Sequence, residues 1–260
     1  MKKIISLLLC VIFMLICAFN VNATSHTASW YCVRKKDHTQ PNLPSDLAFS
    51  KEYDLYWIDE RYSSYNDEEK VIYLTFDAGY ENGNVERILD ALRDEGVFAT
   101  FFILDNMIIK NEELVKRMIE EGHTVANHTT KHKDMTLLNT KEDVAKELEE
   151  LEKLYVKAYG VQMPKLYRPP EGKISEQSLK LAQELGYTAV MWSFAYADWD
   201  NGKQPSCEYA MNKILDNLHN GEVMLLHPTS ETNAKIMKEL ISELKSRGFR
   251  FATAQELCEN

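Results

Sequence analysis

The sequence VIYLTFDAG at residues 71–79 decides the fold. Its first six residues are β-branched, aromatic or leucine, and such a run predicts a strand buried on both faces, as in parallel sheets covered by helices. Asp77 comes directly after this strand, where a carboxylate can act as a base. An aspartate in that place more often caps the next helix. Asn82 and Asn84 are better placed to cap a helix starting near Val85, which leaves Asp77 for chemistry.

Outward from this strand, six glycines each close a charged, helix-patterned segment and precede a short apolar run. They are Gly96, Gly122, Gly160, Gly186, Gly221 and Gly248. Glycine just past a helix end takes the left-handed conformation that other residues resist. The apolar runs, such as 99–103, 188–192 and 223–226, are rich in strand-forming residues. This alternation from residue 71 to 251 predicts one parallel α/β barrel or near-barrel.

The N-terminal segment differs from the rest. Residues 1–3 are Met-Lys-Lys, and a mostly apolar stretch from Ile4 to Phe19 follows before the small residue Ala23. This pattern predicts a secretory signal peptide over residues 1–23, and an uncleaved membrane anchor is the alternative. We therefore expect a secreted or extracytoplasmic protein that is attached to a membrane only if the segment stays uncleaved.

Residues 24–70 contain Pro41, Pro44 and many aromatic residues without clear periodicity. We expect an N-terminal extension that wraps the domain formed by residues 71–260, with residues 66–70 as an exposed join. No internal repeat is present.

Charge excludes one class of partner. Removal of residues 1–23 takes away Lys2 and Lys3 and no acidic residue, so the formal net charge moves from −10 to −12. An acidic protein is repelled by phosphate backbones, so nucleic acid is not an expected partner. Of the five cysteines, Cys10 and Cys17 lie in the signal segment. A Cys207–Cys258 bridge and free thiols both remain open.

Two histidines four residues apart, His128 and His132, follow a predicted strand over residues 123–126. On one helical turn, such a pair lies on one side and can share a metal ion, although two loop histidines are as common. We regard His123 as a bystander. The sequence RPPEG at 168–172 predicts a rigid loop that aims its flanking residues.

Arg168 beside Asp77 would keep that aspartate ionised, although an exposed arginine in a turn is the simpler alternative. His227 ends the apolar run 223–226 and is suited to donate a proton near neutral pH, more so if Asp198 supports its charged form. A metal pair, a base and an acid at strand ends indicate metal-assisted hydrolysis.

Five motifs, in order, carry a family resemblance. They are TFDAGYENG (75–83), NHTTKH (127–132), RPPEG (168–172), WSFAYADW (192–199) and LLHPTSETNA (225–234). Together, over residues 70–255, they resemble the polysaccharide deacetylase family, whose shared region is the NodB homology domain. The chain looks closest to the muramic acid de-N-acetylases that lead to the δ-lactam of spore cortex peptidoglycan.

The resemblance implies a distorted (β/α) barrel and an enzyme that removes N-acetyl groups from a peptidoglycan glycan strand, in the cell wall or between the forespore membranes. It implies a divalent metal, zinc being the first candidate, at His128 and His132. It also implies Asp77 as base, oriented by Arg168, and His227 as acid, tuned by Asp198. We expect the backbone N–H of Glu171 to contact the oxyanion and the rings of Trp199 and Tyr80 to contact the sugar, with buried packing as an equally ordinary alternative for Trp199.

One position departs from the wider family. Ala78 stands where most members carry a second aspartate as a metal ligand, which leaves the identity of the metal open. Two other functions therefore remain: a deacetylase of N-acetylglucosamine in peptidoglycan or chitin-like chains, and a non-catalytic glycan-binding relative. We expect a monomer.

Overall fold

The computed structural model describes residues 26–259. The predicted signal peptide and the first residues of the extension lie outside this range. None of the helices between residues 26 and 259 is long and apolar enough to cross a membrane. Cys32, Cys207 and Cys258 are free thiols, so the Cys207–Cys258 bridge is not formed.

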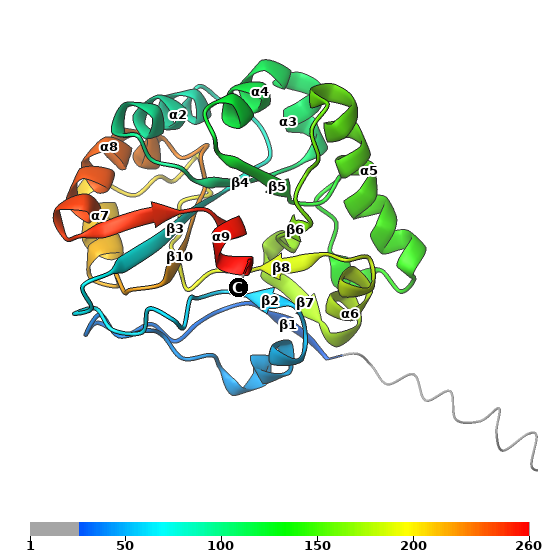
Figure 1. Cartoon of the computed structure of the whole chain (residues 1–260), viewed down its shortest axis with the longest axis horizontal. Coiled ribbons are helices and arrows are strands. Elements are labelled where there is room, and N and C mark those ends of the chain that lie inside the picture. The colour runs from blue at the N-terminus through cyan, green and yellow to red at the C-terminus, as the bar shows by residue number, and fades with distance from the viewer. Residues whose placement is uncertain (1–25, 260) are drawn as a thin grey trace, which may run out of the picture.

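A curled sheet of nine strands forms the centre of the molecule, in the order β2-β8-β6-β5-β4-β3-β10-β9, with β11 also paired to β3 (Figure 1). The strands are β2 (Leu55–Tyr56), β3 (Lys70–Ala78), β4 (Thr100–Ile103), β5 (Thr124–Asn127), β6 (Leu166–Tyr167), β8 (Thr188–Val190), β9 (Phe194–Ala195), β10 (Glu222–Leu226) and β11 (Phe249–Ala252). Every pairing in this sheet is parallel. Within the described residues, the two edge strands, β2 and β9, do not pair with each other, so the predicted barrel is distorted and open.

The longest strand, β3, is the predicted one, and it extends to include Asp77 and Ala78. Its first half pairs with β11 and its second half with β4, while β10 pairs with Ile72–Phe76. Strand alternation then decides which side chains face the barrel interior.

Val71 and Tyr73 belong to an interior cluster drawn from seven strands and α9 (Ala254–Cys258). Ile72, Leu74 and Phe76 pack outward against the helices. Asp77 lies an even number of residues from Val71 and Tyr73, so its side chain points to the same inner face, at the C-terminal end of the strand.

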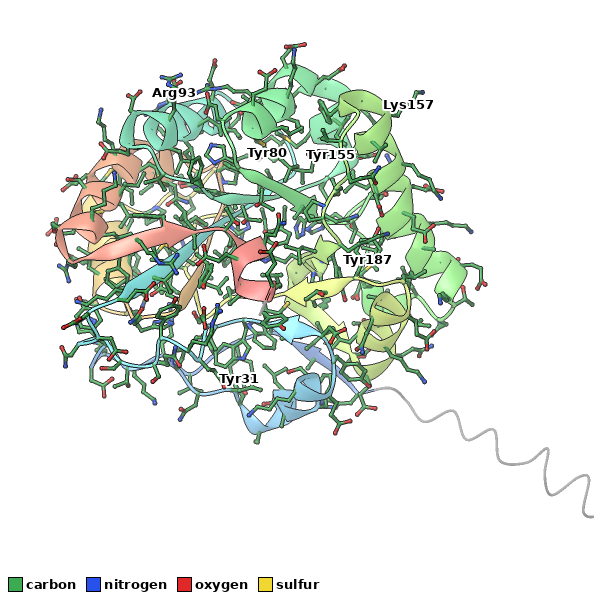
Figure 2. All side chains as sticks on the ribbon, viewed as in Figure 1. Tyr31, Tyr80, Arg93, Tyr155, Lys157 and Tyr187 are labelled. Atoms are coloured by element: carbon green, nitrogen blue, oxygen red, sulfur yellow. The ribbon has the colours of Figure 1, made fainter. Side chains whose placement is uncertain are left out.

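Helices surround the sheet as an outer ring, and α9 lies at the centre (Figure 1). They are α2 (Asn84–Glu95), α3 (Asp105–Lys110), α4 (Glu112–Glu120), α5 (Lys141–Tyr159), α6 (Glu176–Glu184), α7 (Cys207–Leu215) and α8 (Glu231–Ser246), with short 3-10 turns η1 (Ser45–Glu52), η2 (Met135–Leu137) and η3 (Pro170–Gly172). Arg93 of α2 and Lys157 of α5 project outward from this ring (Figure 2). The amphipathic helix pattern thus places charge outside and the apolar face on the sheet.

The N-terminal extension is joined to the barrel at several points. β1 (Thr27–Ser29) pairs antiparallel with β7 (Lys173–Ser175), and β2 forms an edge of the main sheet. All six predicted glycines have positive φ, between 60° and 86°. At Gly221 the space is also needed, because a Cβ there would lie 2.3 Å from the carbonyl oxygen of Asp59 in the extension.

Candidate active site

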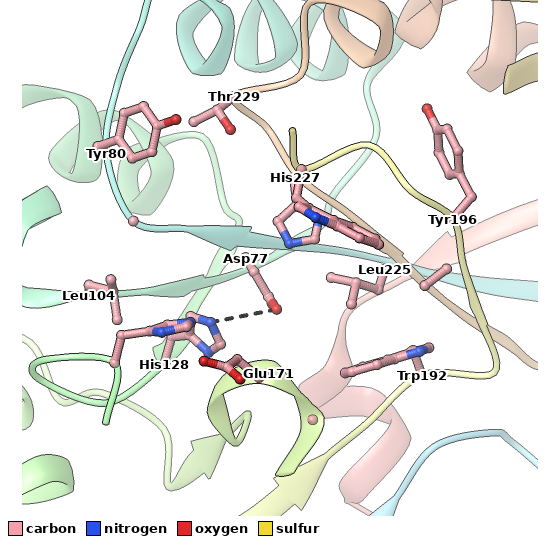
Figure 3. A pocket seen from close by; sticks show the side chains of 15 residues that line it. Asp77, Tyr80, Leu104, His128, Glu171, Trp192, Tyr196, Leu225, His227 and Thr229 are labelled. Carbon is pink, nitrogen blue, oxygen red and sulfur yellow. Dashed lines mark ion pairs between the residues drawn. The ribbon is translucent and has the colours of Figure 1, made fainter. Parts of the chain in front are cut away.

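A cavity of about 670 Å³ opens at the C-terminal ends of the parallel strands (Figure 3). Its lining comes from the loops or residues that end β3, β4, β5, β6, β8, β9 and β10. Seven of the predicted site residues line it: Asp77, Tyr80, His128, His132, Glu171, Trp199 and His227. The other two, Arg168 and Asp198, are buried behind its wall. This is the face at which barrel enzymes place their active sites.

Arg168 is fully buried and holds Asp77 in place. Its Nη1 donates to Asp77 Oδ1 at 2.8 Å, while Nε and Nη2 donate to the carbonyls of Val190 and Met191 at 2.8 and 3.2 Å. The guanidinium also lies over the Phe102 ring, 4.2 Å from its centroid. Burial alone would raise the pKa of Asp77, but the charge and hydrogen bond of Arg168, together with the nearby His128 and His227, outweigh it and lower that pKa below its usual range. Asp77 is therefore an ionised carboxylate facing the cavity.

His128 is buried and faces Asp77. Its Nδ1 lies 3.0 Å from the carbonyl oxygen of Arg168, which can only accept, so Nδ1 carries the proton. Nε2 lies 3.6 Å from Asp77 Oδ2, the pair joined by a dashed line in Figure 3. Burial lowers the pKa of His128 to about 4, although Asp77 opposes the shift. A neutral imidazole with its Nε2 lone pair directed into the cavity is the form that binds metals.

His132 lies beside His128, with the ring centroids 5.0 Å apart. The prediction that one helical turn brings them together is wrong, because residues 128–134 form an irregular loop. Thr129 and His132 instead have φ of 73° and 55°, a left-handed conformation that is uncommon outside glycine. Side chains hold the loop: Thr129 N–H donates to Asn127 Oδ1 at 2.7 Å, and His132 N–H donates to Thr129 Oγ1 at 2.9 Å.

The donor set fits a divalent metal through two imidazoles. In residues 26–259, no group of three or more His, Cys, Asp or Glu side chains is arranged to hold a metal ion. Ala78 does not line the cavity, because it packs in the outer apolar cluster. A metal held here would have two protein nitrogen ligands and open positions, as in a catalytic rather than a structural zinc site.

His227 lines the same cavity and is paired with a buried carboxylate. Its Nδ1 donates to Asp198 Oδ1 at 2.7 Å, and its backbone N–H donates to Asp198 Oδ2 at 2.8 Å. Burial alone would lower the pKa of His227, but the hydrogen bond and negative charge of Asp198, with Asp77 further away, outweigh it and raise that pKa. The pairing favours the charged imidazolium of His227, which lines the same cavity as the ionised Asp77.

The rim carries the remaining predicted residues. Glu171 has φ 56°, and its carboxylate lies 2.8 Å from Lys173 Nζ. A left-handed residue other than glycine stores strain, which clusters at functional sites. Trp199 is 61% exposed, with its ring centroid 6.2 Å from that of His227, and Tyr80 is 45% exposed. Two exposed aromatic rings at a cavity mouth offer flat apolar faces to a ligand.

The prediction that Asn82 or Asn84 caps the following helix holds only in part. The N-cap of α2 is Gly83, without a side-chain hydrogen bond, but Asn82 Oδ1 accepts from the backbone N–H of Asn84, the first residue of the helix, at 3.3 Å. The amide groups of both asparagines also donate to the carbonyl oxygen of Thr229, at 2.9 and 3.0 Å. They thereby link the loop after β3 to the loop after His227, so the strand-end position of Asp77 does not depend on their being caps.

The extension supports the cavity wall in a way that the sequence did not predict. Three alternate side chains donate to main-chain carbonyls of the wall at 2.8 Å each: Trp30 to Trp192, Cys32 to Ser193 and Arg34 to Ala195. Their spacing of two residues is the periodicity of an extended chain, a signal present in the WYCVR sequence at residues 30–34.

Comparison with known proteins shows the family of the chain. The polysaccharide deacetylase family model matches residues 64–190. The peptidoglycan-N-acetylmuramic acid deacetylase PdaA of Bacillus subtilis (strain 168) is 35% identical over 230 residues, which is 88% of this chain and 85% of that protein. The chain belongs to the polysaccharide deacetylase family.

A solved structure of the same relative and one further protein are also similar to this chain. A solved structure of Bacillus subtilis PdaA, described as a family 4 carbohydrate esterase, matches with a TM-score of 0.82 and 34% identity, covering 89% of this chain and 96% of that chain. A peptidoglycan-N-acetylglucosamine deacetylase of Bacillus cereus is 35% identical over 195 residues, which is 73% of this chain and 88% of that protein.

Proposed function

We propose that this protein hydrolyses the N-acetyl group of a peptidoglycan amino sugar, with N-acetylmuramic acid as the first candidate. The observation that carries the proposal is one cavity lined by an Asp77 that Arg168 keeps ionised and by a His227 that is paired with Asp198. The neutral imidazole of His128 lies beside Asp77 in the same lining. Enzymatic amide hydrolysis uses a base to activate the attacking water and an acid to protonate the leaving amine.

The residues assign the steps. A divalent metal at His128 and His132 would supply Lewis acidity toward the acetyl carbonyl and the attacking water. Asp77 takes a proton as the water oxygen bonds to the carbonyl carbon, and the backbone N–H of Glu171 donates to the oxyanion. His227 then protonates the nitrogen as the C–N bond breaks, which releases acetate and a free amine. Arg168 keeps Asp77 charged and oriented throughout.

The cavity mouth suits a glycan strand. Trp199 and Tyr80 stand at the rim as stacking surfaces for sugar rings. A peptidoglycan substrate agrees with the predicted export of the chain past residues 1–23, and with action in the cell wall or between the forespore membranes. We propose the δ-lactam of spore cortex as the fate of the product.

The extent of the match favours muramic acid over glucosamine. The muramic acid relative aligns over 88% of this chain, against 73% for the glucosamine relative at the same 35% identity. Glucosamine deacetylation remains the alternative.

Mass spectrometry of digested peptidoglycan tests the proposal. Incubation with the purified, zinc-loaded protein should remove acetyl groups from muramic acid residues and leave those of glucosamine. The Asp77→Asn protein is the matched control for adventitious hydrolysis. Loss from glucosamine alone would establish the alternative substrate. Unchanged peptidoglycan, with the glycan still bound by the protein, would support the non-catalytic glycan-binding alternative that Ala78 favours.

A further inference from the structure

Asn233 lies behind the acid side of the cavity and is fully buried in the first turn of α8. Its Nδ2 lies 2.7 Å from Asp198 Oδ2 and 3.0 Å from the carbonyl oxygen of His227. Its Oδ1 accepts a hydrogen bond from the Tyr196 hydroxyl. Figure 3 shows that hydroxyl pointing away from Asp77 and the centre of the cavity.

The orientation of the Asn233 amide follows from its partners. An ionised carboxylate and a backbone carbonyl can only accept, so the NH₂ group must face Asp198 and His227. The hydroxyl of Tyr196 then donates to the remaining oxygen. The backbone N–H of Asn233 donates to the N-cap Ser230 at 3.1 Å, which fixes the start of the helix.

We propose that Asn233 is a positioning residue that stabilises the Asp198 carboxylate after His227 has given its proton to the leaving amine. This rests on the proposed role of His227 as the acid. While His227 is charged, the Asp198–His227 pair is neutral as a whole. Once the proton leaves, a buried negative charge remains without its cation, and hydrogen-bond donors must compensate for it.

Asp198 Oδ2 then has two donors, the His227 backbone N–H and Asn233 Nδ2. Removing Asn233 leaves one of them, which destabilises the deprotonated pair more than the neutral one. His227 would hold its proton more tightly. Asn233 therefore limits the rise in the pKa of His227 that Asp198 causes.

The other charged groups near His227 do not depend on Asn233. Asp77 on β3 raises the pKa of His227, and Arg168 after β6 lowers it. Tyr196 stays neutral, because burial raises the pKa of its hydroxyl well above the usual value. A change in His227 titration on replacing Asn233 can therefore be assigned to Asp198.

The test uses Asn233→Leu, which keeps side-chain size and removes the donors, and Tyr196→Phe, which removes only the hydroxyl that fixes the amide. NMR titration of the His227 imidazole in the metal-free protein should show its pKa rise by about one unit in Asn233→Leu. The rise should be smaller in Tyr196→Phe. The alkaline limb of kcat/KM should move to higher pH by the same amounts, with kcat lowered by less than about tenfold.

Asn220→Leu is the matched control, because Asn220 is also fully buried but bonds to Ser64, Glu69 and Val71 instead. It should lower stability and leave the His227 titration unchanged. An unmoved or lowered His227 pKa in folded Asn233→Leu would overturn the proposal. If Asn233→Leu does not fold, an unchanged His227 pKa in Tyr196→Phe would overturn the proposal instead. A raised pKa without deacetylase activity in the wild type would retain the positioning role and reject the proposed function.

Discussion

The two sides of the cavity use the same residue type in opposite charge states. His128 and His227 are both held through Nδ1, and both direct their other ring nitrogen to the cavity side. The partner of His128 is the neutral carbonyl of Arg168, and its pKa falls to about 4. The partner of His227 is the Asp198 carboxylate, and its pKa rises. Burial lowers the pKa of His128, whereas the hydrogen bond and charge of Asp198 outweigh burial at His227, which fits the roles proposed for them as metal ligand and acid.

The two sides also differ in backbone. His227 directly follows β10, and α8 begins four residues later, so regular elements place it. His132 stands in an irregular loop with left-handed residues, held by side-chain bonds from Asn127 and Thr129. The position of His132 therefore depends on a few individual hydrogen bonds, whereas strand ends place Asp77, His128 and His227. A substitution beside Asp77 or His227 should therefore change the chemistry of that residue and leave that of the other unchanged.

The largest expected effect is that of His128→Ala, which removes a proposed metal ligand beside Asp77. Bound metal should disappear, and kcat/KM should fall by about a thousandfold, since a metal supplies several kcal/mol of transition-state stabilisation. Metal content and turnover of the purified variant measure this. His123→Gln is the control, because His123 is buried but lies outside the cavity lining. Normal metal content and activity in His128→Ala would remove this histidine from the site.

Asp77→Asn should have the second-largest effect on turnover. It keeps the shape of the base and removes its charge, so turnover should fall by on the order of a hundredfold or more. Metal content should stay near that of the wild type, because the two histidines remain. Steady-state kinetics with parallel metal analysis measure both. A nearly fully active variant would show that Asp77 is only a structural partner of Arg168.

Sequence patterns predicted the features that depend on regular strands and helices. The strand at residues 71–76, the positive φ of the glycines and the strand-end placement of Asp77, His128 and His227 all follow from periodicity and parallel-sheet geometry. Five ordered motifs then assigned the family.

The failures lie where tertiary contacts override local preference. A spacing of four residues predicted a helical turn at His128–His132, but side-chain bonds from Asn127 and Thr129 hold a loop there. Asn82 has good capping chemistry, yet its amide bonds to Thr229, which lies far away in sequence. Asn233 was within a recognised motif, but its role depends on packing between α8 and the loop after β9.

The acid side can be changed alone by Asp198→Asn. The sign follows from the pairing: Asp198 raises the pKa of His227, so loss of its charge should lower that pKa and move the alkaline limb of kcat/KM to lower pH. A shift of about one unit is expected, with at most about tenfold lower activity at alkaline pH. The pH profile measures it, and metal affinity should not change. An alkaline limb that does not move would reject the Asp198–His227 pairing as the source of the acid.

The smallest expected effect tests the loop on the base side. Thr129→Val keeps the branched side chain but removes the Oγ1 that accepts the His132 N–H at 2.9 Å. Without it, His132 should be less well positioned, and metal affinity should weaken by about tenfold, as for other residues that orient a metal ligand. The alkaline limb set by His227 should stay in place. Calorimetric titration with zinc and the pH profile measure the two sides separately.

Thr129→Ser is the matched control, because it retains the hydroxyl and should bind zinc as the wild type does. Equal zinc affinity in Thr129→Val and Thr129→Ser would show that the left-handed backbone holds His132 without this bond. A shifted alkaline limb in Thr129→Val would show that the two sides are coupled, which contradicts the separation that their different partners imply.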